Sequence, residues 1–471
     1  MATTRFSSVL SSIAERGLSI MGLSGSGRKQ ADAAGIIELC HMLLSSKGEA
    51  SGIGLSFEIL SQYRQLDEDE KTKFFHALGQ DFSPDRDAVE STAKAYIELP
   101  SPRNLAALAS ATVPVRQELL MRLNQAPDAT RHLVNMRADL LARIKHDREL
   151  ELVDREFVQL FTSWFNRGFL ELRNIDWHTS ASILEKIIRY EAVHGMSGWE
   201  ELRGRIDPED RLIYGFFHPR LGDEPLIFVE VALMEQMPGS ITDVLASNQE
   251  TAVEAANTAI FYSISNCQKG LLGIPLGNFL IKQVVEDLQR NYPRLKEFAT
   301  LSPVPGFARW LQQARAGNGD TLLPEDTIAA IEAVGNGEWW TDEKLSRSLE
   351  KQLVPAIAWY LCEEKDSEGR PIDPVARFHL GNGAKLERIN WAGDISTGAL
   401  NASLGIMVNY RYQLDEIERN HEQFANSRTV VASASVMQSA KAFRNLIKKA
   451  DVARKRSEAE SAEETVEDLT V

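Results

Sequence analysis

The chain has few cysteines, and their spacing in the sequence suggests no disulfide between any two of them. Its 471 residues include only Cys40, Cys267 and Cys362, an odd number at wide separations. Such usage fits reduced thiols in a cytosol-like compartment better than a disulfide framework. The sequence also lacks a Cys-x-x-Cys or His-x-x-x-His pair, so it predicts no bound metal.

Long apolar runs and excess positive charge are missing too. The longest apolar runs, such as residues 226–233 with Glu230 among them, fall far short of the roughly 20 residues that a membrane-spanning helix needs. With 52 Lys and Arg against 67 Asp and Glu, the net charge of -15 would repel a nucleic-acid backbone. We therefore expect a soluble, cytoplasmic protein with no nucleic-acid and no membrane partner.

The chain does have enough length and apolar residues for two domains, with 471 residues of which 43% are hydrophobic. Residues 1–30 are Ser-rich and contain Glu15 as their only acid. We interpret them as a flexible arm, formed by a short amphipathic stretch and a Gly-Ser linker at residues 22–27. An organelle transit peptide is the alternative interpretation.

Residues 31–168 are predicted to form an all-α domain. Apolar residues recur there at helical spacing, as at Leu133, Met136, Leu140 and Ile144. Helix starts are indicated at Ser83-Pro84, at Ser101-Pro102 and at Asp128. The histidines in this region are scattered singly, so we expect a scaffold and no catalytic cluster. The apolar helical faces are expected to support a homo-oligomer, either a dimer or a tetramer.

From about residue 169 to residue 421 the pattern predicts an α/β domain. Helices are expected at 180–193 and 198–205, followed by strands at 212–218 and 225–233. A further strand at 259–265 leads into CQKGLLGIPLGN and then into an amphipathic helix at 279–289. This order places free backbone amides at a helix N-terminus, where glycines at 270, 273 and 277 would let the backbone approach a pyrophosphate.

The glycine-rich turn alone leaves two interpretations open, because a tight strand-to-helix turn also needs glycine. It lacks the Gly-Lys-Ser/Thr of a Walker loop and the Gly-x-Gly-x-x-Gly of a Rossmann fingerprint. It is similar to the acyl-CoA loop of the GCN5-related acetyltransferase fold. That similarity implies a CoA-binding set of Gly270, Leu271, Gly273, Gly277 and Asn278.

Two other segments carry a more specific resemblance. They read FATLSPVPGFARWL at residues 298–311 and RFHLGNGAKLERINWAGDISTGALNASLGIMVNYRY at residues 377–412. With the sequence that begins near Trp177, they resemble the malonyl-CoA decarboxylase family. The resemblance implies an α+β chain, in which an N-terminal helical domain precedes an acetyltransferase-like catalytic domain. It also implies a carboxy-lyase that converts malonyl-CoA into acetyl-CoA and CO2 without a cofactor, because the thioester carbonyl is itself the electron sink.

The resemblance places catalytic roles on Ser302, His379 and Tyr412. Ser302 would donate a hydrogen bond to the malonyl carboxylate or the thioester oxygen. His379, with an ordinary pKa of about 6.5, would deliver the proton to carbon. Tyr412 shares one face of the expected strand 406–412 with Tyr410 and would bond the serine or the carboxylate.

Each of these residues also has a purely structural interpretation. Ser302 precedes a proline and could cap a turn, His379 could be satisfied by strand backbone, and paired tyrosines in a strand are mostly packing residues. Two other function classes therefore stay open: an acyltransferase that moves an acyl group from CoA to an acceptor, and a non-catalytic CoA-binding regulatory protein.

Three features lie outside these motifs. Animal members of the family carry a glutamate, to which an orienting role in the site is given, where this chain has Pro275. If this chain also needs a carboxylate in that role, Asp394 is the first candidate to supply it. Residues 317–368 resemble an insertion that could cover the site. Residues 422–471 are expected to be a helix that passes into a disordered tail.

Overall fold

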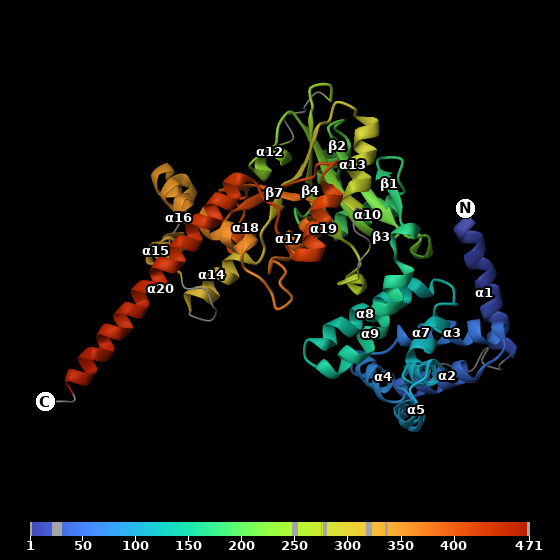
Figure 1. Cartoon of the computed structure of the whole chain (residues 1–471). Helices are drawn as coiled ribbons and strands as arrows, with labels where there is room; N and C mark the ends of the chain where they lie inside the picture. Colours follow the sequence, from blue (N-terminus) through green and yellow to red (C-terminus); the bar gives the residue numbers. More distant parts are fainter. Residues whose placement is uncertain are drawn as a thin grey trace. The chain divides into compact units, whose positions relative to one another are not determined.

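A computed structural model describes residues 2–20, 31–246, 253–274, 276, 280–316, 323–334 and 338–468 (Figure 1). The chain forms two compact units. The first unit contains residues 1–173 together with 216–227 and 266–277, and the second contains residues 174–215, 228–265 and 278–471. Each unit is described by itself below.

The first unit is helical. Its helices are α1 (Ala2–Ile20), α2 (Ala33–Ser45), α3 (Glu49–Tyr63), α4 (Glu68–Gln80), α5 (Arg86–Glu98), α6 (Pro102–Ala111), α7 (Val115–Leu123), α8 (Ala129–Ile144) and α9 (Glu151–Trp164). Short 3-10 turns lie at Arg148–Leu150, Arg167–Phe169, Pro219–Leu221 and Lys269–Leu271. The expected N-terminal helical region is confirmed.

Helix starts in this unit follow short polar side chains, as the sequence predicted, although not always at the predicted residue. Ser101 accepts a hydrogen bond from the amide of Asn104 at the start of α6, with Pro102 in the first helical position. Helix α5 begins at Arg86 and is capped by Asp85, two residues after the predicted Ser83. Asp128 precedes α8 in a left-handed conformation and makes no side-chain cap bond.

Residues 2–20, which the sequence assigned to a flexible arm, form helix α1 and pack on α3. The two helices approach so closely that a Cβ at Gly17 would lie 2.0 Å from the carbonyl oxygen of Ala50. A Cβ at Gly54 would lie 2.9 Å from the amide nitrogen of Leu18. Glycine is therefore needed at both contact points, because any side chain would force the helices apart.

The second unit is built on an eight-stranded sheet. Its strands are β1 (Glu171–Ile175), β2 (Arg211–Phe217), β3 (Pro225–Met234), β4 (Thr258–Asn266), β5 (Glu297–Thr300), β6 (Ser302–Pro303), β7 (Lys385–Asn390) and β8 (Met407–Arg411). The order is β1-β2-β3-β4-β5-β8-β6, and β7 pairs with β8. Strands β4 and β5 are parallel, whereas β8 runs antiparallel to β5, β6 and β7.

Helices of the second unit cover both faces of this sheet. They are α10 (Ala181–Tyr190), α11 (Trp199–Ile206), α12 (Ile241–Leu245), α13 (Leu280–Asn291), α14 (Phe307–Arg315), α15 (Glu325–Val334), α16 (Glu343–Cys362), α17 (Pro374–Gly381), α18 (Thr397–Ser403), α19 (Ile417–Ser427) and α20 (Ala434–Asp468). The predicted alternation of helices and strands from about residue 169 is thus confirmed, with element ends that differ by a few residues. The C-terminal segment is helical as far as Asp468, and α20 packs on α16 through Phe443 and Trp359.

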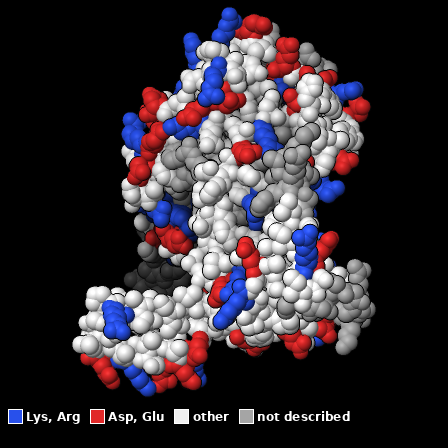
Figure 2. Space-filling view, turned by 90° about the vertical axis from the view of Figure 1, so that its right-hand side faces the viewer, with Lys and Arg blue, Asp and Glu red and all other residues white. Residues whose placement is uncertain are grey.

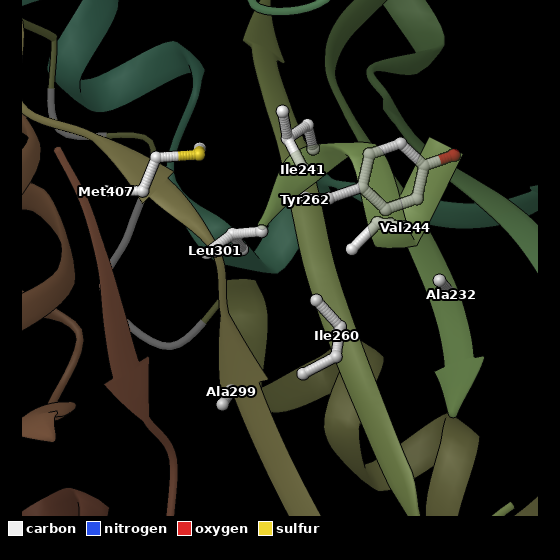
Figure 3. Packing of buried hydrophobic residues seen from close by; sticks show 8 residues of the cluster. All are labelled: Ala232, Ile241, Val244, Ile260, Tyr262, Ala299, Leu301 and Met407. Atoms are coloured by element: carbon white, nitrogen blue, oxygen red, sulfur yellow. The ribbon is translucent and has the colours of Figure 1, made fainter. Parts of the chain in front are cut away.

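The alternation of side chains along β5 and β6 decides what lies on each face of the sheet. Ala299 and Leu301 join a buried apolar cluster with Ile260, Tyr262 and Met407, to which α12 contributes Ile241 and Val244 (Figure 3). Successive residues of a strand point to opposite faces, so Thr300 and Ser302 face the other way. The pairing of β4 with β5 ends at Phe261 and Thr300, and β4 continues to Asn266.

No helix in the described part of the chain is long and apolar enough to cross a membrane. Figure 2 shows one face of the molecule, on which basic and acidic side chains lie close to one another. Exposed charges also form ion pairs along helices, such as Lys94 with Glu90 and Arg347 with Glu343.

Candidate active site

Ser302 is held in a buried position next to the end of the β4-β5 pairing. Its side chain is only 6% exposed, and its hydroxyl donates a 2.8 Å hydrogen bond to Thr300 Oγ1. That oxygen also accepts a 3.1 Å bond from the backbone amide of Tyr410. Ser302 is therefore part of a strand and of a side-chain network, not the capping residue of a turn.

His379 comes to Ser302 from helix α17, in place of the strand that the structural interpretation assumed. Asp373 caps this helix by accepting a 2.8 Å bond from the amide of Ala376, and Pro374 takes the first helical position. One turn and a half further on, the imidazole of His379 lies 3.1 Å from Ser302 Oγ through Nε2. Helix α17 also contacts α19, where His421 bonds the carbonyl of Gly381 (Figure 1).

Tyr410 of β8 and Tyr412, which follows the end of β8, both contact His379. The hydroxyl of Tyr412 lies 2.8 Å from Nδ1, and the ring of Tyr410 stacks on the imidazole with centroids 4.6 Å apart. Tyr412 also packs edge-on against Phe261 of β4. The structure thus brings together Ser302, His379 and Tyr412, the three residues that the sequence proposed.

The hydrogen bond from Ser302 to Thr300 fits one tautomer of His379 and one direction of proton donation through these three residues. Ser302 gives its own proton to Thr300, so its oxygen is free to accept one from Nε2–H of His379. The other ring nitrogen, Nδ1, then has no proton and accepts from Tyr412. Complete burial holds the pKa of the Tyr412 phenol well above its usual range, which keeps that donor protonated.

Burial changes the charge expected for His379. The sequence suggested an imidazole with an ordinary pKa, but the ring is 3% exposed, and desolvation lowers its pKa to about 3. In this structure the histidine is therefore neutral at pH 7. It can become the proton donor only if something in the site raises its pKa again.

Sequence reasoning missed a buried carboxylate near these residues. Asp373 is 0% exposed, and desolvation raises its pKa to about 6. Burial raises the pKa of Tyr410 and of Tyr360, and the charge of Asp373 raises both further, so the three groups lie close together. The Asp-Pro pair before the FHL motif is a recognisable helix start, and this signal could have identified Asp373.

The remaining family motif residues support the walls of the site. Asn390, in the RINW motif, donates a 2.8 Å hydrogen bond to Asn409 of β8, whose amide in turn bonds the carbonyl of Thr300 at 2.7 Å. Trp391 bonds Ser346 of α16. Asp394 accepts from the amide of Ser396 and lines a cavity on the Tyr262 face of the sheet, whereas His379 lies on the Ser302 face.

The glycine-rich turn is described only in part. Pro275, Gly277 and Asn278 lie outside the described residues. Packing explains why residue 270 is a glycine, because a Cβ at Gly270 would lie 1.8 Å from the carbonyl oxygen of Val134. Arg137 of α8 also donates hydrogen bonds to the carbonyls of Gly270 and Leu272. Leu271 is buried.

Gly273 differs from Gly270. Its φ of +77° is in the region that favours glycine, and a Cβ there would meet nothing within 4 Å. Its neighbour Leu272 is an exposed apolar residue. Gly273 is therefore the described part of the turn at which backbone is both unusual in conformation and open to approach by a ligand.

Family models match most of the chain. The malonyl-CoA decarboxylase C-terminal domain matches residues 168–453, and the corresponding N-terminal domain matches residues 82–165. The mitochondrial malonyl-CoA decarboxylase of Mus musculus is 34% identical over 440 residues, which cover 85% of this chain and 88% of that protein.

Solved structures agree with these sequence matches. The crystal structure of malonyl-CoA decarboxylase from Rhodopseudomonas palustris has a TM-score of 0.84 and 48% identity, covering 86% of this chain and 99% of that one. The crystal structure of malonyl-CoA decarboxylase from Agrobacterium vitis has a TM-score of 0.80 and 50% identity, again covering 86% of this chain and 99% of that one. On this evidence the chain belongs to the malonyl-CoA decarboxylase family.

Proposed function

We propose that this carboxy-lyase removes CO2 from malonyl-CoA through a thioester enolate, with Ser302, His379 and Tyr412 as the residues that act on the substrate. The observation that carries the proposal is the buried chain of hydrogen bonds that joins Tyr412, His379 and Ser302. Two of its members, Ser302 and His379, are separated by 77 residues in sequence.

The reaction needs one oxyanion stabilised and one proton delivered. The bond between the carboxylate carbon and the α-carbon breaks, and its electron pair moves into the thioester carbonyl to give an enolate as CO2 leaves. A hydroxyl donor close to the developing oxyanion lowers this barrier. Ser302 can turn its proton from Thr300 toward the substrate oxygen, because the strand holds its Oγ in place.

The proton would come from His379, and the substrate itself would make that possible. A carboxylate near the ring favours the imidazolium form and raises a histidine pKa by about 1 to 3 units. Raised by this amount from about 3, the pKa of His379 would reach at most about 6, so about half of the bound complex would carry the proton at pH 6 and a minor fraction at pH 7. The imidazolium then gives this proton to the α-carbon of the enolate and is neutral again, which restores the starting state.

Net proton uptake on binding tests this step. A thioether analogue that keeps the malonyl carboxylate but has no carbonyl cannot lose CO2. Titration calorimetry at pH 6 in buffers of different ionisation enthalpy should show proton uptake for this analogue, and none for the His379→Asn variant. Equal uptake by both proteins would mean that another group takes the proton.

The glycine-rich turn is proposed to hold the pyrophosphate of CoA through its backbone amides. A Gly273→Val variant should raise KM by roughly tenfold and leave kcat nearly unchanged, because it blocks approach to the backbone. Gly222→Val is the matched control, since Gly222 also has a positive φ, of +61°, and open space around a Cβ. If both variants raised KM equally, backbone strain rather than phosphate binding would explain the effect.

One assay tests the proposed function directly. Purified protein incubated with malonyl-CoA alone should release CO2 and acetyl-CoA in equal amounts. We expect EDTA to leave the rate unchanged, because the thioester carbonyl accepts the electron pair without a metal. An acyltransferase would need an added acceptor, and a regulatory protein would bind malonyl-CoA without turnover. A rate lost on chelation and restored by a divalent metal would contradict the proposed chemistry.

A further inference from the structure

The glycine-rich turn is anchored by a buried arginine of the helical unit. Arg137, on helix α8, is 2% exposed. Its Nη1 donates hydrogen bonds to the carbonyls of Gly270 and Leu272, at 2.7 and 2.9 Å. These bonds join residues that are 133 and 135 positions apart in sequence, and all three residues belong to the first compact unit.

The guanidinium is itself held in one orientation. Asp154 of α9 accepts from its Nε at 2.7 Å and from its Nη2 at 3.2 Å, the two-bond geometry that arginine forms with a carboxylate. Gly270 also lies against the backbone of Val134, three residues before Arg137 on the same face of α8. Because the guanidinium is fixed on both sides, its donors fix the two carbonyls of the turn.

The bonded carbonyls decide where an amide of the turn points. In a planar trans peptide the C=O and N–H bonds point in opposite directions. The carbonyl of Leu272 accepts from Arg137, so the amide of Gly273, in the same peptide group, points away from α8. One hydrogen bond from the helical unit therefore sets the direction of this amide.

This amide also has room for a ligand. Among the described residues of the turn, the amides of Leu271, Leu272 and Ile274 donate to backbone carbonyls, and that of Gly273 donates to none. Residue 273 is exposed, and a Cβ there would meet nothing within 4 Å. Backbone N–H groups that are free and approachable in this way bind phosphate oxygens.

We propose that Arg137 is a positioning residue for CoA binding, which holds the carbonyl of Leu272 so that the amide of Gly273 points at the pyrophosphate. This inference rests on the pyrophosphate-binding role proposed above for the turn. The charge of Arg137 is paired with Asp154, so Arg137 acts through the backbone and is not itself a phosphate ligand. The helical unit thus takes part in substrate recognition in addition to serving as a scaffold.

Two substrates separate this role from a general role in folding. Malonyl-pantetheine has the same thioester as malonyl-CoA but lacks the pyrophosphate. Arg137→Lys keeps a positive charge beside Asp154, but one ammonium cannot reproduce the fork that bonds the carboxylate and both carbonyls. The variant should raise KM for malonyl-CoA by about tenfold, the loss expected for one hydrogen bond to a charged group. Its kcat, and its kcat/KM for malonyl-pantetheine, should stay within about twofold of the natural values.

The matched control is Arg116→Lys. Arg116 is 5% exposed and lies in the same unit, where it bonds Glu156 at 2.9 and 3.1 Å. Its other bonds go to Ser83 and to the carbonyl of Leu152, not to the turn. This variant should lose a similar amount of thermal stability and keep the natural KM for both substrates.

The outcomes distinguish this inference from the function on which it rests. If Arg137→Lys lowered kcat/KM equally for both substrates, or changed neither, Arg137 would have no positioning role. If the natural protein used malonyl-CoA and malonyl-pantetheine with equal kcat/KM, the pyrophosphate role of the turn would be wrong, and the role of Arg137 with it. That second result is measured without any variant.

A double variant tests whether Arg137 acts through Gly273. Arg137→Lys should raise KM of the Gly273→Val protein by less than about twofold, because both substitutions affect the same amide. A full tenfold increase would place the effect of Arg137 elsewhere.

Hydrogen exchange on the natural protein supplies a measurement that holds even if Arg137→Lys fails to fold. CoA should slow exchange of the Gly273 amide, and pantetheine should not. An exchange rate at Gly273 that is the same with and without CoA would overturn the inference.

Discussion

Replacing His379 by asparagine should lower kcat by about 100-fold or more, the range that general acid catalysis supplies, while KM changes little. The substitution removes the group that would carry the proton to the enolate. It also interrupts the hydrogen-bond chain between Tyr412 and Ser302. Steady-state rates of CO2 release measure both parameters.

The matched control is His421→Asn. His421 also contacts helix α17, through a 2.7 Å hydrogen bond to the carbonyl of Gly381, but it is not part of the chain from Tyr412 to Ser302. Its loss should change kcat by less than about threefold, since a single hydrogen bond to backbone contributes only about 1 kcal/mol to the local structure. A similar loss of rate in both variants would indicate that displacement of α17, and not the missing imidazole, causes the defect.

Ser302→Ala and Tyr412→Phe should each lower kcat, as His379→Asn does. When the three substitutions are combined in one protein, the fold loss of kcat should be much smaller than the product of the three single losses. Residues that act as one unit give such non-additive effects. Nearly multiplicative losses would mean that the three side chains act independently.

The pH dependence of stability should have opposite signs for His379 and Asp373. The folded protein holds His379 neutral, with a pKa lowered from 6.5 to about 3. As the pH falls below 6.5, the unfolded chain takes up a proton at this histidine before the folded protein does. Between pH 7 and pH 4 this costs the folded state about 3 kcal/mol by linkage.

Asp373 should act in the other direction. Its pKa is raised from 3.8 to about 6 in the folded protein, so the folded state takes up the proton first as the pH falls. The stability contributed by this carboxyl group should therefore rise by about 2 kcal/mol between pH 7 and pH 4. The two effects largely offset each other in the natural protein, and variants are needed to separate them.

Urea unfolding at pH 7, 5.5 and 4 measures this difference. The stability of the natural protein relative to His379→Asn should fall over this interval, and its stability relative to Asp373→Asn should rise. Asparagine can still accept the helix-capping bond from Ala376, so α17 should persist in the second variant. Parallel pH curves for the natural protein and either variant would show that the corresponding group has an ordinary pKa.

The linear sequence identified most of the secondary structure because periodicity and capping are local. The strand and helix around the glycine-rich turn were predicted within three residues of β4 (Thr258–Asn266) and α13 (Leu280–Asn291). The arm at residues 1–30 was less successful, because the sequence indicated no partner for its amphipathic stretch, which contains Gly17. In the structure the same glycine permits a close helix contact with Ala50, and a partner this far along the chain is visible only in the folded protein.

For the site, the sequence by itself determined which residues are available: the serine before Pro303, the histidine of FHL, and Tyr412, which directly follows β8. The strand at Ser302 was not predicted, and the structure was needed to show that Ser302 and Leu301 face opposite ways. The charge of His379, the partnership with Asp373 and the cavity at Tyr262 depended on tertiary structure. A pKa is set by the surroundings of a group, and these surroundings come from β6, β8 with the residue that follows it, and α17, segments that meet only after the chain has folded.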